Sequence, residues 1–342
     1  MPVYAGPWWK DGEAGHGFVR IERGRVVDKG ERSPAGATPA VILEGLHNYH
    51  THVGDAFLRG RVLPRGLDAL VKPVTGYKHR MLATAKPSVL QSGVRRALQG
   101  YAASGTRTIL DFREQGIQGL AWVRRVQDAL GQDAPRVHLL ARPTGPNPSE
   151  TDMAEVVERA DGIGLPSLSD VGAATLRVAA EACQHAKKPL AMHASERRRE
   201  AIEAILEARP DLLVHMNAAT PADLRRVRDA GVPVAACPSS NAYFRIPSQV
   251  RSLRRAGVRF YLGTDNAMLG NADLVREARE AKKRCPEVRD DELLLALNTP
   301  PEKAIKRVRR VTLPPGGGEA IVVLALRGKR VRWAAKPILA RR

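Results

Sequence analysis

The chain has 342 residues, of which 43% are hydrophobic and 27% are charged, as is typical of a globular protein with a sizeable core. No apolar run approaches the ~20 residues that span a membrane, and the N-terminal residues lack the apolar stretch of a signal peptide. We therefore expect a cytoplasmic protein. The 3 cysteines form no close-spaced pair, which argues against a disulfide framework and a thiolate metal cluster.

The formal net charge of +19 is unusual. It fits a nucleic-acid partner, an arginine-rich surface with ion-pair networks, or attraction of an anionic small substrate. The basic residues are scattered along expected helices, as in Arg95-Arg96 and Arg254-Arg255, and aromatic residues make up only 4% of the chain. Because few aromatic side chains could stack on bases, we favour a charged surface over nucleic-acid binding.

The two ends of the chain carry similar hairpin patterns. Near the N-terminus, residues of alternating character flank a turn at Arg23-Gly24. Near the C-terminus, the apolar segment Glu319–Leu326 precedes a turn at Gly328 and a further short strand. Neither hairpin would be stable alone, so we expect residues 1–40 and 311–342 to pair into a small β-sandwich.

Helices and short apolar strands alternate between these ends, from residue 41 to residue 310. Glycine marks helix ends at Gly231 and Gly257, whereas Thr220-Pro221 and Ser169 mark helix starts. The expected strands are the one at Val41, then Ile109–Asp111, Val137–Ala141, Gly162–Leu165, Pro189–His193, Leu212–His215, Val232–Cys237 and Arg259–Leu262. Eight parallel strands predict an α/β fold of the (β/α)8 barrel type.

Ionisable side chains stand at the ends of four of these strands. His50 and His52 lie one residue apart beyond the first strand, so in an extended chain both project from the same face. The fifth, sixth and eighth strands lead to His193, His215 and Asp265, respectively. A barrel brings these strand ends to one mouth, whereas a doubly wound open sheet, the structural alternative, would not.

These residues resemble the amidohydrolase superfamily, and within it the branch of cytosine deaminase, adenosine-type deaminases and chlorohydrolases. The resemblance rests on His50-Thr51-His52, His193-x-x-Glu196, the lone His215 and the turn Gly263-Thr264-Asp265-Asn266. It extends over most of the chain, and it implies a metal-dependent hydrolase on a distorted (β/α)8 barrel.

The resemblance also implies a role for each residue. The implied ligands of one divalent metal ion are His50, His52, His193 and Asp265. Nitrogen and carboxylate ligands suit zinc, with iron as the alternative, and such an ion lowers the pKa of its water towards ~7. Glu196 would carry protons to the substrate ring, His215 would orient or deprotonate the water, and Asp265 would pass a proton to the leaving group.

Structural explanations exist for some of these residues. Glu196 precedes a helix expected at 197–208, where the helix dipole favours a carboxylate without any catalysis. Asp265 could cap a helix. The fourth strand, Gly162–Leu165, offers no lysine to bridge two metal ions, as the binuclear branch of the superfamily requires, so we expect a mononuclear site.

Two arginines follow strands that open towards the same mouth. Arg113 lies next to Glu114, which could pair with it internally, whereas Arg142 has no acidic neighbour in sequence. A buried guanidinium needs an anion, so we expect Arg113 and Arg142 to bind a negative group of the substrate.

Three functions remain open. The first is hydrolytic deamination of a nucleobase, nucleoside or related amino-heterocycle, the second is hydrolysis of another C–N or C–Cl bond, and the third is nucleic-acid binding without catalysis. Glu196 favours the first function, and the complete ligand set argues against the third. The expected partner is a small-molecule substrate, anionic if the arginines bind it; a homo-oligomer is allowed, and no membrane partner is expected.

Overall fold

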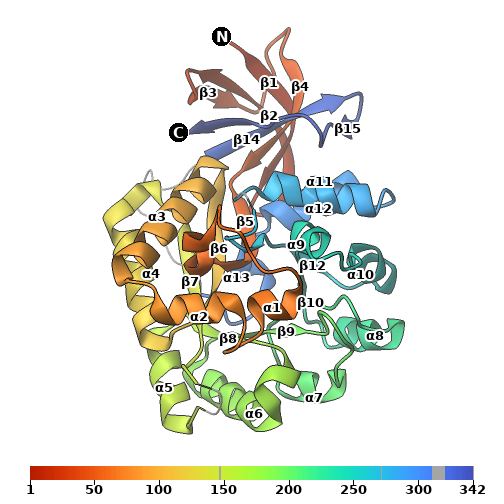
Figure 1. Cartoon of the computed structure of the whole chain (residues 1–342). Coiled ribbons are helices and arrows are strands. Elements are labelled where there is room, and N and C mark those ends of the chain that lie inside the picture. Colours follow the sequence, from red (N-terminus) through yellow and green to blue (C-terminus); the bar gives the residue numbers. More distant parts are fainter. Residues whose placement is uncertain (146–147, 271, 310–319, 342) are drawn as a thin grey trace.

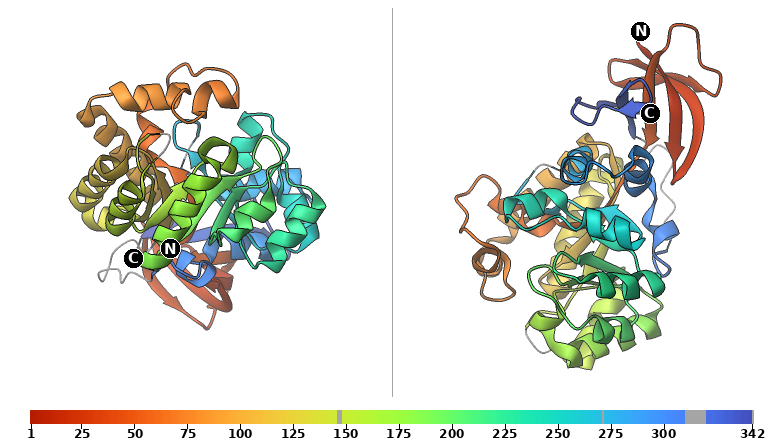
Figure 2. Two further views of the ribbon diagram at one scale, coloured as in Figure 1. Left: turned by 90° about the horizontal axis from the view of Figure 1, so that it is seen from below. Right: turned by 90° about the vertical axis from the view of Figure 1, so that its right-hand side faces the viewer.

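The computed structural model describes residues 1–145, 148–270, 272–309 and 320–341. Figure 1 places a sheet of terminal strands at one end of the molecule and a ring of strands and helices below it. Both labelled chain ends lie at the terminal sheet (Figure 2). Among the described helices, none combines the length and the apolar character needed to cross a bilayer.

The central sheet contains parallel strands in the order β12-β11-β10-β9-β8-β7-β6-β5-β13. Their bounds are β5 (Leu46–His52), β6 (Thr106–Arg113), β7 (Arg136–Ala141), β8 (Gly162–Leu165), β9 (Leu190–Ala194), β10 (Leu212–His215), β11 (Val234–Ala236), β12 (Phe260–Leu262) and β13 (Asp265–Asn266). Only two residues separate β12 from β13, and β13 pairs with β5. The sheet therefore closes on itself as a TIM-like α/β fold, as the strand count predicted.

The seam between the last and the first strand depends on side-chain hydrogen bonds. Asn48 Nδ2 donates to Thr264 Oγ1 at 2.8 Å, and the Thr264 amide donates to Asn48 Oδ1 at 3.2 Å. A Cβ on Gly263 would lie 2.7 Å from His50 Cβ, closer than such atoms approach. Only glycine therefore lets β12 pass this close to β5.

Helices follow most of the barrel strands and cover the outside of the barrel (Figure 1). Their bounds are α3 (Pro87–Ala103), α4 (Gly116–Leu130), α5 (Glu150–Arg159), α6 (Leu168–Ala186), α7 (Ile202–Glu207), α8 (Pro221–Asp229), α9 (Pro238–Tyr243), α10 (Val250–Ala256), α11 (Leu274–Arg284), α12 (Asp290–Asn298) and α13 (Pro301–Ala304). An inserted segment after β5 contains a 3-10 turn (Val53–Leu58), α1 (Leu67–Val71) and α2 (Tyr77–Thr84), and a second 3-10 turn (Gly131–Asp133) precedes β7. The apolar faces of these helices and of the strands form the main core.

Some helix boundaries confirm the prediction and others correct it. Thr220 caps α8 with a reciprocal capping box, as expected. The start of α6 is capped at Ser167 and not at Ser169, although the side chain of Ser167 makes no capping hydrogen bond. The helix expected at 197–208 begins only at Ile202, because residues 195–198 form a bend.

The terminal segments pair into one seven-stranded sheet, so the association predicted for the two chain ends is confirmed. Its strands are β1 (Val3–Lys10), β2 (Glu13–Glu22), β3 (Arg25–Gly30), β4 (Thr38–Glu44), β14 (Ala320–Arg327), β15 (Arg330–Val331) and β16 (Ile338–Arg341). Because β14 pairs with both β16 and β4, six of the strands close a hydrogen-bonded ring, which differs from two separate layers of a sandwich. The expected boundary at residues 310 and 311 lies outside the described residues.

The first barrel strand begins later than predicted. Val41 lies in β4, which pairs with β1 and β14 in the terminal sheet. Gly45 then takes a φ of 76°, and the barrel strand β5 starts at Leu46. The sequence alone predicts one strand here, but the left-handed conformation of Gly45 divides the segment into two strands.

Replacing Gly263 with alanine tests the seam. The added methyl group would overlap His50, so we expect Gly263→Ala to lower the free energy of unfolding by about 1–3 kcal/mol, the usual cost of overpacking. Gly270→Ala is the matched control, because a Cβ there meets no atom within 4 Å. Denaturant titration measures both, and equal stability of the two variants would show that the seam tolerates a side chain.

Candidate active site at the barrel mouth

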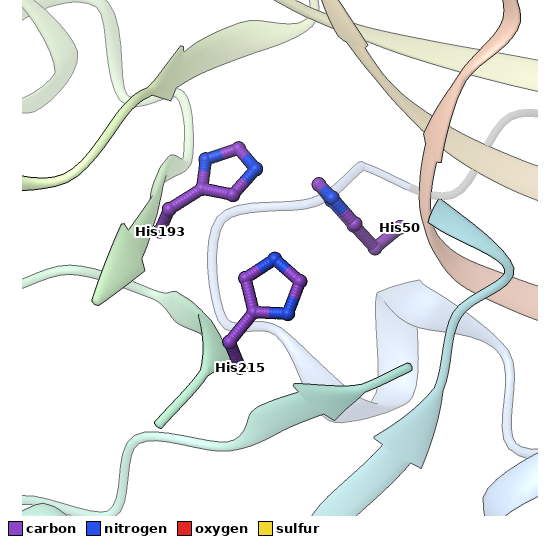
Figure 3. A group of neighbouring side chains, drawn as sticks. All are labelled: His50, His193 and His215. Atoms are coloured by element: carbon purple, nitrogen blue, oxygen red, sulfur yellow. The ribbon is translucent and has the colours of Figure 1, made fainter. Parts of the chain in front are cut away.

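The structure brings the candidate ligands to one end of the barrel. His50 and His52 lie on β5, His193 lies on β9, His215 ends β10 and Asp265 begins β13. In Figure 3 the rings of His50, His193 and His215 turn towards one another from three parts of the barrel. The ring centroids of His50 and His193 are 4.8 Å apart, and those of His50 and His215 are 5.6 Å apart. The residues at the ends of these strands therefore form one cluster, as the barrel predicted from the sequence requires.

The ligand atoms are close enough to share a metal ion. Three overlapping groups have their ligand atoms within 4.8 Å of one another: His50 with His193 and His215, His50 with His52 and Asp265, and Glu196 with His215 and Asp265. Asp265 Oδ1 lies 3.2 Å from His50 Nε2 and 3.7 Å from His52 Nε2. The cluster thus offers both imidazole nitrogen and carboxylate oxygen to a cation.

Backbone carbonyls fix the orientation of two imidazole rings. His193 Nδ1 lies 2.8 Å from the Leu165 carbonyl oxygen, and His52 Nδ1 lies 3.1 Å from the Phe112 carbonyl oxygen. A proton on each Nδ1 leaves Nε2 as the free electron pair that binds metals. Burial lowers the pKa of His52 to about 3 and also lowers the pKa of His193, so both rings are neutral, as ligation requires.

Asp265 is held as a carboxylate. Ser240 Oγ donates to its Oδ2 at 2.5 Å, and Asn266 Nδ2 donates to its Oδ1 at 2.9 Å. Burial alone would raise the pKa of Asp265, but the histidines around it, His50 first, lower this pKa well below its usual range. Asp265 begins a strand and does not cap a helix, so the alternative interpretation of this residue is wrong.

Glu196 faces the same cluster from the bend after β9. Its Oε1 lies 3.5 Å from His215 Nε2, and the next helix, α7, starts six residues later at Ile202. The helix dipole therefore does not explain this carboxyl group. Burial, and then the negative charge of Asp265, raise the pKa of Glu196 well above its usual range, which favours the protonated form of this carboxyl group.

Backbone strain is concentrated at these strand ends. Ser195, His215, Met216 and Asp265 have φ values of 47°, 74°, 62° and 60°, respectively. Residues other than glycine rarely adopt such φ values, and those that do are found preferentially at functional sites. Two of these residues, His215 and Asp265, belong to the cluster.

A cavity that opens to solvent lies over the cluster, and His193, His215 and Asp265 line it. Besides the cluster, the charged residues that line the cavity are Asp68, Lys72, Lys78, His79, Glu114, Arg142, Asp170, Arg197, Arg198 and Glu200. Arg142 is among these residues, as predicted, and forms no ion pair with any residue that the structure describes.

Arg113 does not take the place that the sequence predicted. Its side chain is 2% exposed and is absent from the cavity lining. Its NH2 lies 2.5 Å from Glu114 Oε2, its NH1 lies 3.6 Å from Asp111 Oδ2, and its guanidinium packs against Gly54. Arg113 is thus a buried cation that pairs within the protein. Of the two interpretations of this residue, pairing with Glu114 is correct and contact with the substrate is not.

Sequence reasoning missed two charged residues beside the cluster. Glu114 Oε1 lies 3.0 Å from His52 Nδ1 and 2.7 Å from Lys78 Nζ. Burial would raise the pKa of Glu114, but Lys78, His52 and Arg113 together lower it well below its usual range. The sequence could have indicated Glu114, because this residue follows β6 and therefore lies at the barrel mouth. It could not have indicated Lys78, because this residue comes from an inserted helix.

A barrel with a histidine and carboxylate cluster at the carboxyl ends of its strands belongs to the class of metal-assisted barrel enzymes. The comparisons define the class further: the model of the Amidohydrolase family matches residues 38–298. The chain belongs to this family, as its motifs indicated.

Named relatives support this assignment. A putative aminohydrolase of Archaeoglobus fulgidus is 33% identical over 279 residues, covering 81% of this chain and 78% of that protein. A 5-methylthioadenosine/S-adenosylhomocysteine deaminase of Halobacterium salinarum is 27% identical and covers 78% of this chain and 68% of that protein. The crystal structure of guanine deaminase from C. acetobutylicum has the same fold, with a TM-score of 0.68 at 11% identity, covering 94% of this chain and 90% of that chain.

The two arginines at the mouth should respond differently to removal of their charge. Arg113→Met would leave Asp111 without its buried cation and Glu114 with Lys78 alone, so we expect a loss of about 3–5 kcal/mol in the free energy of unfolding. Arg142→Met, the matched control, breaks no ion pair within the described residues and should cost much less. Equal stability of the two variants in denaturant titration would contradict the structural role of Arg113.

Proposed function

We propose that the chain is a hydrolytic deaminase of an amino-heterocycle with one divalent metal ion. The residues that would hold the ion are His50, His52, His193 and Asp265, with His215 beside them. Zinc suits this set of neutral imidazoles and one carboxylate, and iron is the alternative. When bound, a divalent ion would supply Lewis acidity that lowers the pKa of water. The absence of a lysine in β8 supports a mononuclear site.

The observation that carries the proposal is the position of Glu196. Its carboxyl group lies 3.5 Å from His215 and lines the cavity, and burial raises its pKa, which favours the protonated form. A ring nitrogen of the substrate must gain a proton as water attacks the neighbouring carbon, and Glu196 is placed to donate it. Asp265, held as a carboxylate, can accept a proton from the attacking water and pass it to the departing amine, which leaves as ammonia. The proton of the new hydroxyl group returns to Glu196 as the C–N bond breaks and the ring carbonyl forms.

Arg142 supports a narrower class of substrate. Burial lowers the pKa of its guanidinium, and a negative ligand group in the cavity would relieve this cost. We therefore propose that the substrate carries a carboxylate or phosphate away from the amino-ring. The H. salinarum relative is named for two substrates, one with a carboxylate and one without, and they form a useful test pair.

The proposal is tested by ammonia release from a panel of amino-purines, amino-pyrimidines and their nucleosides with metal-loaded protein. Release of ammonia from at least one ring substrate is the expected result. Metal-dependent cleavage of cyclic amides or C–Cl bonds, with no ammonia from any amino-ring, would favour the second function within the same family.

Substitution of Glu196 separates proton transfer from metal binding. Glu196→Gln keeps the size of the side chain but holds no transferable proton, so we expect a normal metal content and a loss of roughly 10²–10⁴ in kcat. His193→Ala should instead lose the metal, and Glu203→Gln, an exposed carboxylate on α7, should behave as wild type. Metal analysis with steady-state kinetics measures all three; full activity of Glu196→Gln would remove the proton-transfer role.

Substitution of Arg142 tests the charge of the substrate. Arg142→Met should raise KM for S-adenosylhomocysteine, which carries a carboxylate, by roughly 10-fold or more, the effect of one lost charge-assisted hydrogen bond. KM for the neutral 5-methylthioadenosine should change little. Equal losses on the two compounds would show that Arg142 supports the barrel and does not bind an anion.

A further inference from the structure

Lys78 is a buried cation on an element that lies outside the barrel. It belongs to the segment 59–85, which contains α1 and α2 and stands out from the barrel in the right-hand view of Figure 2. This segment, called the α1–α2 segment below, supplies Leu67, Val71 and Pro73 to the cavity wall. The side chain of Lys78 is nevertheless only 2% exposed, because it reaches inward to the barrel mouth.

The ammonium group of Lys78 donates one hydrogen bond, to Asn266 Oδ1, and lies within ion-pair distance of two carboxyl groups. Its Nζ lies 2.7 Å from Glu114 Oε1, 3.1 Å from Asn266 Oδ1 and 3.4 Å from Asp55 Oδ2. Burying an ammonium without partners is costly, so this set of contacts fixes the position of Lys78 and of the helix that carries it.

Two of these acceptors contact residues of the proposed metal site. Glu114 Oε1, which forms an ion pair with Lys78, lies 3.0 Å from His52 Nδ1. Asn266 accepts from Lys78 through Oδ1 and donates through Nδ2 to Asp265 Oδ1 at 2.9 Å. One ammonium is therefore linked, through one residue on each side, to ligands on both strands of the barrel seam.

We propose that Lys78 is a positioning residue through which the α1–α2 segment holds His52 and Asp265 in the geometry that binds metal. The inference rests on the proposed metal site. Partners that orient metal ligands typically contribute 10–100-fold to metal affinity or activity. The α1–α2 segment thus lines the substrate cavity and also supports the metal site. Displacing this segment would weaken metal binding.

A purely structural role for Lys78 makes a different prediction. In such a role, the positive charge of Lys78 would stabilise the fold by balancing the buried charges of Asp55 and Glu114, and it would not set the geometry of His52 and Asp265. Loss of Lys78 would then lower stability while the folded protein kept its affinity for metal. Metal affinity of the folded variants therefore separates the two roles.

The experiment measures zinc affinity by chelator competition for the wild type and three variants, together with thermal unfolding. Lys78→Gln keeps a donor for Glu114 but removes the charge, and Lys78→Ala removes the whole side chain. Lys86→Met, an exposed lysine at the start of α3, is the matched control. The visible spectrum of the cobalt-loaded protein reports ligand geometry independently of activity.

We expect zinc affinity to fall about 10–100-fold in Lys78→Gln and Lys78→Ala, with an altered cobalt spectrum, and to stay unchanged in Lys86→Met. Propylamine should restore the spectrum of Lys78→Ala, whereas propanol should not. Wild-type affinity and spectrum in a folded Lys78 variant would overturn the proposal. Weaker metal binding in the variants, with no deamination by the wild type, would uphold Lys78 and reject the proposed reaction.

Discussion

Closure of the barrel at the seam between β13 and β5 is the constraint on which the site depends. Asn48 and Thr264 hold the seam through two side-chain hydrogen bonds, and Gly263 leaves the space for it. His50 and Asp265 lie on opposite sides of this seam, 3.2 Å apart. Because His50 and His52 lie on the first strand and Asp265 lies on the last, an open sheet of the same strands would separate them.

The residues around the seam include a network of buried charges, which costs free energy. Behind His52, the cations Lys78 and Arg113 face the carboxylates of Asp55, Asp111 and Glu114, all nearly inaccessible to solvent. Well-packed apolar residues in place of such ion pairs often give a fold of equal or greater stability, because removing ions from water costs free energy even when the ions pair. The network is explained by its contact with the candidate ligands. The Glu114 carboxylate lies 3.0 Å from His52 Nδ1 and favours the proton on that nitrogen, which also faces the Phe112 carbonyl oxygen, so Nε2 is left free for the cluster.

The sequence predicts the parts of this site that follow from local pattern and from one topological rule. Short apolar runs ending in His193, His215 and Asp265 identify the strand ends, and the parallel barrel places them together. The pairing of Arg113 within the protein, the reach of Lys78 from an inserted helix and the division of an apolar run at Gly45 depend on tertiary contacts. Neither periodicity nor spacing records such contacts, so these features required the structure.

Anomalous diffraction from crystals of the zinc-loaded protein tests the central claim most directly. A single metal peak should lie about 2.0–2.2 Å from nitrogen atoms of His50, His52 and His193 and from an Asp265 oxygen, with Glu196 outside the coordination shell. Two peaks at the barrel mouth would contradict the mononuclear site. A peak bound away from β5 and β13 would contradict the claim that closing the seam builds the site.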